Sequence, residues 1–393
     1  MLRHAIFSRF QKISFFRLAL LSLTLLDELM VGFALEAGLP LLRDQVGLSY
    51  EQVGFLFSIG AVSALLLEPI INLLSDRTSK RWWVLGGLLS LALGYGLAGS
   101  THNYIVLLIA FALIYPASGA AVGLSEAALI DDAPHAATRT MTRWTLIASI
   151  GDLLSPLVVA AFVALSLGWS ELCWFAVIAW TVAALMVGLQ RFPRPACAPD
   201  NDTSDASILA NLRKAIRDPL LLRWAVLAIL PFMLDEVFTG FSVLYLRDVL
   251  HADQVVISMS IVAQMIGALL GLLIVDRLVG HIAPQQLLVW LSLLSLTGII
   301  ILLSIHITIV AIGALFTISL GAAGLYPIAQ AEAYARQPGR SGMVRAIIGL
   351  GTPFEIALPG LVGLVAGHFG VLTGVALLGT APLLILLLAP KHT

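Results

Sequence analysis

Leu26-Asp27-Glu28 followed by Gly32-Phe33, and Leu234-Asp235-Glu236 followed by Gly240-Phe241, are two copies of one pattern, separated by about half of the chain. Each copy lies inside an otherwise apolar run. At about 1.5 Å of rise per residue, the ten residues from Arg17 to Asp27 place the Asp27 carboxylate about 15 Å along a helix, at the middle of a bilayer. A duplicated chain with acidic residues at that depth is typical of secondary transporters, because their repeats place substrate and ion sites near the midplane.

The composition of the whole chain indicates an integral membrane protein. Hydrophobic residues make up 59% and charged residues only 11% of the 393 residues, and the mean hydropathy is +0.98. The net charge of −1 indicates no nucleic-acid partner, and two cysteines, Cys173 and Cys197, are too few for a disulfide framework. No phosphate loop, nucleophile–base pair or metal-ligand spacing is present in the sequence, so we expect neither an enzyme nor a cofactor.

Apolar segments of helical length predict an all-α membrane protein with twelve spans. We place them at 18–42, 51–75, 82–100, 104–130, 143–167, 170–190, 223–246, 254–275, 284–304, 307–331, 345–367 and 371–389. They form two six-helix bundles, 18–190 and 223–389, after a cytoplasmic N-terminal segment, 1–17, and before a short tail, 390–393. The linker, 191–222, is polar and Pro-rich at first and then has the apolar spacing of a short amphipathic helix.

The distribution of basic residues predicts the orientation of these spans. When the connections are assigned alternately to two sides, every Lys and Arg except Arg43 and Arg247 falls on one side. Because positive charges mark cytoplasmic loops, both termini are expected in the cytoplasm of a multi-pass plasma (inner) membrane protein.

The connection after the second span carries a recognisable charged motif. Asp76-Arg77 followed by Lys80-Arg81 resembles the loop 2–3 signature of the major facilitator superfamily, with Asn72 and Ser79 at the places of its two glycines. Asp276-Arg277 is a shorter copy after the eighth span. The resemblance implies two pseudo-symmetric six-helix bundles, with the first and seventh helices lining a central cavity and the fifth and eleventh beside them. It specifies no subfamily.

An aspartate at the end of one helix can hold a transporter gate closed through an arginine two or three helices away. The candidate gating residues are Asp76, Arg77, Arg81, Asp132, Arg139, Asp276, Arg277, Glu332 and Arg340, with Asp131, Arg143 and Arg345 as further possible partners. We expect these residues to control conformation without contacting the substrate.

Six acidic residues share one depth near the middle of the spans. These are Asp27, Glu28, Asp152, Asp235, Glu236 and Glu355, with Glu68 nearby. A charge at the centre of a lone helix costs about 2.5–3.5 kcal/mol, so the acids are expected to face water, to hold protons, or to bind a cation. Asp27 with Asp152, and Asp235 with Glu355, can form one site in each half. Since adjacent helical residues point about 100° apart, Glu28 and Glu236 are the better candidates for hydrogen-bonded contacts between helices.

These observations favour a proton-coupled transporter that moves a small cationic or polar organic substrate, outward, by alternating access. Its partners are the substrate, protons and the lipid bilayer, and we expect it to act as a monomer. One alternative is a divalent-metal transporter that uses Asp27, Asp152, Asp235 and Glu355 as oxygen ligands. The other is a membrane sensor or assembly factor that transports nothing.

Overall fold

The chain is helical throughout the described ranges. The computed structural model describes residues 15–31, 38–190, 192, 212–252 and 254–390. Within these ranges there is no β-strand, and eleven helices are long and apolar enough to cross a membrane. The prediction of an all-α membrane fold is therefore confirmed. The predicted first span, 18–42, and the predicted linker, 191–222, lie partly outside the described residues.

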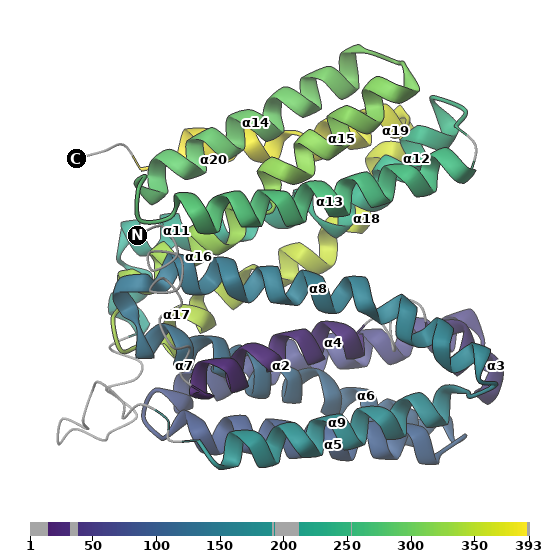
Figure 1. The fold of residues 1–393 in the computed structure, drawn as a ribbon, viewed down its shortest axis with the longest axis vertical. Coiled ribbons are helices and arrows are strands. Elements are labelled where there is room, and N and C mark those ends of the chain that lie inside the picture. The colour runs from purple at the N-terminus through teal and green to yellow at the C-terminus, as the bar shows by residue number, and fades with distance from the viewer. Residues whose placement is uncertain (1–14, 32–37, 191, 193–211, 253, 391–393) are drawn as a thin grey trace, which may run out of the picture. The chain divides into compact units, whose positions relative to one another are not determined.

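Helix packing divides the chain into two compact units. Unit 1 comprises Met1–Asp132, Ile147–Asp200 and Gly339–Ala346, and unit 2 comprises Ala133–Leu146, Asn201–Pro338 and Ile347–Thr393. Two of the borders fall inside helices, α8 (Ala137–Ala164) and α17 (Ser341–Ile348) (Figure 1). The short segment 339–346 thus packs in unit 1, although the residues directly before and after it belong to unit 2.

Unit 1 begins with α2 (Phe15–Val31), α3 (Leu39–Val46) and α4 (Tyr50–Ser75). Then come α5 (Lys80–Ser100), α6 (Tyr104–Ser118), the π-helix η2 (Gly119–Gly123), α7 (Leu124–Asp132) and α9 (Trp169–Gly188). Polar caps explain where the helices start. Ser49 and Gln52 form a reciprocal capping box on α4, and the Asn103 side chain accepts a hydrogen bond at the start of α6.

Unit 2 contains α11 (Pro219–Ile229), the 3₁₀ turn η4 (Leu230–Leu234), α12 (Glu236–Asp248), α13 (Gln254–Leu278), α14 (Pro284–Ser304) and α15 (Thr308–Ala322). It continues with α16 (Leu325–Ala335), η5 (Gly349–Gly351), α18 (Thr352–Phe369), α19 (Val371–Leu378) and α20 (Thr380–Leu388). The span Pro219–Asp248 is interrupted at η4, where Pro231 removes a backbone hydrogen-bond donor. Asp235 lies at this break, immediately before α12.

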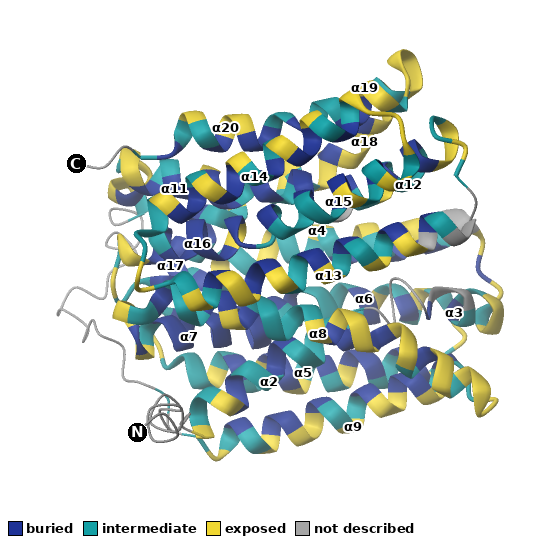
Figure 2. Ribbon diagram, turned by 45° about the horizontal axis from the view of Figure 1, so that its top comes forward, coloured by how far each residue is buried: buried dark blue, intermediate teal, exposed yellow. Residues whose placement is uncertain are grey.

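The two halves repeat one packing pattern. In unit 1, α6 packs against α4 and α5, and α5 packs against α9; in unit 2, α15 packs against α13 and α14, and α14 packs against α20. Small residues allow these close approaches, as at Gly267 on α13, where an added Cβ would lie 2.5 Å from the Phe316 carbonyl oxygen of α15. Helices α7 and α16 are buried on nearly every side (Figure 2).

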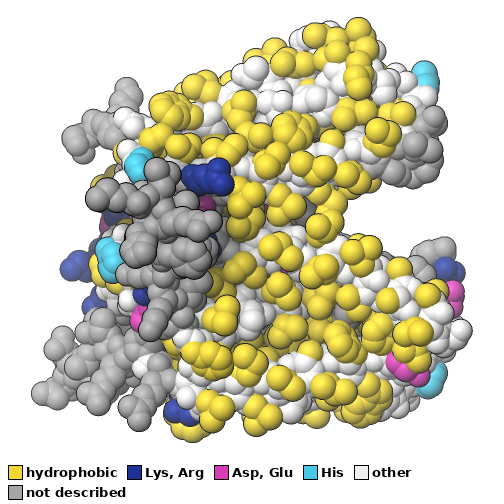
Figure 3. All heavy atoms as spheres, viewed as in Figure 1, with side chains coloured by type: hydrophobic (Ala, Val, Ile, Leu, Met, Phe, Trp, Pro, Cys, Tyr) yellow, Lys and Arg dark blue, Asp and Glu magenta, His cyan; other side chains and the backbone are white. Residues whose placement is uncertain are grey.

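Apolar side chains cover the outer faces of the long helices. Leu89 and Leu93 on α5, and Ile105 and Ile109 on α6, are all more than half exposed. In the space-filling view, hydrophobic side chains cover the length of the helices, and charged side chains gather at their ends (Figure 3). Such a surface is suited to contact with lipid, since a water-exposed surface would carry mixed charge.

Candidate functional site

A pocket in unit 1 combines acidic and aromatic side chains. It has a volume of about 210 Å³, and Asp27, Glu68, Tyr95, Phe111, Tyr115 and Trp169 are among the residues that line it. We call it the acid–aromatic pocket. The residues come from five helices, α2, α4, α5, α6 and α9, so no single stretch of sequence contains the site.

Asp27 is held at the pocket by the end of α6. The Ser118 hydroxyl lies 2.9 Å from each carboxylate oxygen of Asp27 and donates its one proton there. The neighbouring Glu28 lies on another face of α2, where an added Cβ on Gly151 of α8 would come within 3.0 Å of the Glu28 Cβ. The two adjacent acids therefore point at different surroundings, and the pocket is lined by Asp27 alone of the pair.

Glycines on facing helices let the pocket side chains lie close to the backbone. Glu68 on α4 places its carboxylate directly over Gly119, the first residue of the π-helix. Two turns earlier on α4, Gly60 gives room to the Tyr115 ring, since an added Cβ would lie 2.5 Å from the Tyr115 Cδ2. Single π-helical turns often mark functional sites, and this one begins directly after Ser118, which lines the pocket.

Arg345 is the functional candidate whose place the sequence did not reveal. Its guanidinium lies over Gly123, and its Nη1 is 3.3 Å from a carboxylate oxygen of the buried Glu126 on α7. The Arg345 charge also interacts electrostatically with Asp27 and Glu68. In the sequence Arg345 is a possible gating partner at the start of an apolar span, and no signal there indicates that its charge interacts with Asp27 and Glu68.

The remaining predicted acids are distributed over both units. Asp152 on α8 is exposed, and its charge interacts electrostatically with Asp27. In unit 2, Asp235 is exposed at the helix break and Glu355 is half-buried in the first turn of α18. Among the described residues, no hydrogen bond or ion pair joins Asp235 to Glu355, and the Glu236 side chain lies outside the described part.

The alternative prediction, a divalent-metal site, requires several acidic side chains close together. Among the described residues, no group of three His, Cys, Asp or Glu side chains is placed to hold a metal ion.

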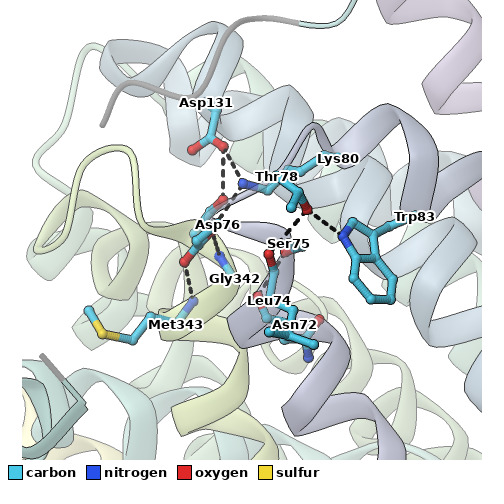
Figure 4. Close-up of polar contacts among 11 residues, drawn as sticks. Asn72, Leu74, Ser75, Asp76, Thr78, Lys80, Trp83, Asp131, Gly342 and Met343 are labelled. Atoms are coloured by element: carbon cyan, nitrogen blue, oxygen red, sulfur yellow. Dashed lines mark hydrogen bonds and ion pairs between the residues drawn. The ribbon is translucent and has the colours of Figure 1, made fainter. Parts of the chain in front are cut away.

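Asp76 lies at the centre of a second polar cluster (Figure 4). Its carboxylate accepts hydrogen bonds from the backbone N–H groups of Gly342 and Met343, at 2.9 and 2.8 Å, and from Lys80 Nζ at 3.0 Å. Lys80 Nζ also lies 2.9 Å from Asp131, which accepts a further hydrogen bond from Ser341 at 3.0 Å. Asp76, Lys80, Asp131 and Ser341–Met343 form what we call the Asp76 cluster. It joins the 339–346 segment to the rest of unit 1.

The composition of this cluster corrects one expectation. The sequence suggested an arginine partner for Asp76, whereas the charged partner is Lys80, one turn further along the chain, and two donors are backbone amides at the start of α17. Free N–H groups at a helix N-terminus favour a carboxylate, which explains why the Asp76 carboxylate binds at the start of α17. Burial raises the pKa of the Asp76 carboxyl above its ordinary value, although Lys80 and the two amides oppose that shift.

The other candidate gating residues form separate contacts. In unit 2, Arg143 Nε lies 2.9 Å from Asp276 Oδ1, and Arg139 donates to the Val279 carbonyl at 2.7 Å. In unit 1, Arg17 pairs with Asp132 at 2.8 Å. The rest lie elsewhere: Arg81 donates to the Gly188 carbonyl at the end of α9, Arg77 and Arg277 are exposed, and Glu332 and Arg340 are half-buried.

Comparisons with known proteins place this geometry in a family. The family model of the Major Facilitator Superfamily matches residues 20–353. Among solved structures, the chain is similar to the E. coli fucose:proton symporter FucP (17% identity, 95% of this chain and 98% of that chain, TM-score 0.73). It is also similar to the human organic anion transporter MFSD10 (20% identity, 96% and 97%, TM-score 0.71) and to a bacterial homologue of the iron transporter ferroportin (14% identity, 95% and 98%, TM-score 0.75).

At such low identities the solved structures show the fold alone, and these three proteins are named for different transported substances. No curated protein sequence matches the chain. The family model covers most of the chain, and the structural similarity extends over both halves. The predicted resemblance is therefore confirmed: the chain belongs to the major facilitator superfamily, as a multi-pass membrane transporter.

Proposed function

We propose that this transporter couples the movement of protons to the outward movement of a small organic cation. The observation that carries the proposal is the acid–aromatic pocket, in which Asp27 and Glu68 share one cavity with four aromatic rings. Carboxylates supply negative charge, and aromatic faces attract an ammonium group with about 0.5–2 kcal/mol per favourable contact. A pocket of about 210 Å³ has room for a small substituted ammonium ion.

Proton coupling follows from competition at the same carboxylates. A proton and an organic cation both neutralise Asp27 or Glu68, so each is bound less well when the other is present. Asp152, which interacts electrostatically with Asp27, belongs to the same proposed site. In unit 2 we assign Asp235 and Glu355 the equivalent role, with Glu28 and Glu236 at helix contacts.

Alternating access requires contacts that break and reform. The Asp76 cluster is suited to this role, because it attaches the 339–346 segment to unit 1 while the adjoining chain belongs to unit 2. The Arg143–Asp276 pair in unit 2 is a second such contact. The other predicted gating residues, Arg77, Arg81, Asp132, Arg139, Arg277, Glu332 and Arg340, are assigned to the same conformational control.

Binding of choline, a permanently charged probe, tests the proposal. Calorimetry on protein in a maltoside detergent should show choline binding that tightens as the pH rises and releases protons, because choline displaces protons from the carboxylates. The neutral isostere 3,3-dimethylbutan-1-ol should bind at least about tenfold more weakly, a difference of about 1.4 kcal/mol.

Equal binding of the two probes, or no choline binding, would contradict the proposed substrate class. Displacement of choline by Mn²⁺ at equimolar concentration would favour the divalent-metal alternative. In proteoliposomes, an imposed pH gradient should drive choline against its concentration gradient. Choline flux that is independent of the pH gradient would contradict the proposed proton coupling.

Orientation in the membrane can be tested with single cysteines. His306 is exposed between α14 and α15, and Cys173 is buried. With Cys197→Ser as background, His306→Cys should react with an impermeant thiol reagent added to intact cells, since the positive-inside pattern places this loop outside. Cys197 of the wild type should react only after permeabilisation, and the opposite pattern would reverse the proposed topology.

A further inference from the structure

Four charged side chains follow one another along a single helical path in unit 1. Asp27 is bound to Ser118, Glu68 lies over Gly119, Arg345 lies over Gly123, and Glu126 follows one turn later. Residues three or four apart on a helix are neighbours on one face, so Glu68, Arg345 and Glu126 follow one another in the order acid, cation, acid, with Asp27 bound at Ser118, next to Gly119 in the chain. Arg345 therefore has acidic residues on both sides.

The position of Arg345 links two features that have so far been separate. On one side it pairs with the buried Glu126, and on the other its charge interacts with Asp27 and Glu68 of the acid–aromatic pocket. Arg345 itself belongs to the segment 339–346, whose residues Ser341, Gly342 and Met343 form hydrogen bonds of the Asp76 cluster. A change in the charge of the pocket therefore changes the electrostatic attraction that acts on Arg345.

We propose that Arg345 is a resident counter-cation of the acid–aromatic pocket, and that a cationic substrate competes with it for Asp27 and Glu68. The inference rests on the proposed function, since it takes the substrate to be a cation. Binding of substrate weakens the attraction between the pocket and Arg345, and so loosens the attachment of the 339–346 segment. Arg345 acts as a positioning residue that contacts no substrate.

Two substitutions should move choline affinity in opposite directions. Arg345→Gln removes the competing charge, so choline should bind about tenfold more tightly. Glu126→Gln removes the negative charge beside Arg345 outside the pocket. The attraction of Arg345 for Asp27 and Glu68 then becomes stronger, so choline should bind severalfold more weakly. A merely structural pair would give losses in both variants, because both leave one buried partner uncompensated.

Two further variants serve as controls. Arg345→Lys keeps the positive charge and should restore affinity to within about threefold of the wild type. The double variant Arg345→Gln/Glu126→Gln removes both charges, avoids an uncompensated buried carboxylate and should bind choline as tightly as Arg345→Gln. It keeps the test usable if the single Arg345 variant folds poorly.

The attachment of the segment has its own readout. Met343 is buried, and only its backbone bonds to Asp76. With Cys197→Ser as background, choline should speed the labelling of Met343→Cys by a thiol reagent severalfold, and 3,3-dimethylbutan-1-ol should not.

The outcomes separate the two proposals. Choline binding that depends on Asp27 but weakens, or stays the same, in both Arg345→Gln and the double variant overturns the role of Arg345 alone. Unchanged labelling of Met343→Cys overturns its link to the segment. Absence of choline binding in the wild type and in all Arg345 variants overturns the proposed function together with this inference.

Discussion

Asp27→Asn is expected to weaken choline binding by about 10- to 100-fold and to remove most of the accompanying proton release. The amide can neither hold an exchangeable proton nor attract the ammonium charge, and two unit charges about 6–10 Å apart attract each other by roughly 2–3 kcal/mol at an effective dielectric constant of about 20. At about 1.4 kcal/mol per factor of ten, this gives the stated range. Calorimetry in two buffers with different ionisation enthalpies measures affinity and proton release together.

Glu28→Gln is the matched control, because Glu28 adjoins Asp27 in the chain but lies against α8 at Gly151. It should leave choline affinity within about threefold of the wild type and mainly lower thermal stability. Asp235→Asn and Glu236→Gln form the corresponding pair in unit 2, with the effect on coupling expected for Asp235. If Asp27→Asn and Asp235→Asn release as many protons as the wild type, the coupling role lies elsewhere, and Asp152 and Glu355 are the next pair to test.

Asp76→Asn should reduce transport at least about tenfold while changing choline affinity by no more than about threefold. The substitution removes the charge that Lys80 and two backbone amides share, so the 339–346 segment is held less firmly. A residue that biases conformations without touching the ligand changes the rate of cycling more than the intrinsic affinity. The measurement is pH-gradient-driven choline flux in proteoliposomes, compared with calorimetric affinity in detergent.

Asp44→Asn provides the same chemical change at an exposed aspartate on α3 and should leave both quantities unaltered. A large loss of choline affinity in Asp76→Asn, with normal flux at saturating choline, would assign Asp76 to the binding site. Equal losses of flux in the two variants would show a general effect of surface charge.

The sequence was sufficient for the class of fold, because its signals are local. Apolar runs of helical length, the bias of basic residues and the repeated Leu-Asp-Glu pattern each require only neighbouring residues to be read. The Asp76-Arg77…Lys80-Arg81 motif was enough to indicate the family that the comparisons confirm. Asp27 could be singled out because a carboxylate inside an apolar span is costly wherever the helix points.

The other parts of the site depend on how each helix is turned about its axis, and the sequence does not state this. In a soluble helix the apolar stripe shows which face is buried, but in a membrane the lipid-facing side is apolar too. Tyr95, Phe111, Tyr115 and Trp169 are therefore indistinguishable in sequence from aromatic residues that face lipid.

Sequence alone thus determined a duplicated, all-helical membrane protein with acidic residues deep in its spans. Tertiary structure alone decided that Asp27 and Glu68 share a pocket with aromatic rings, and that the charge of Arg345 interacts with both of them from a segment more than 200 residues away in the chain. The physical reason is that these charged side chains need neighbouring helices that approach one another closely. Only the packing of Gly119 and Gly123 against their neighbours leaves room for a carboxylate and a guanidinium on one helical face, and that packing is a property of several helices together.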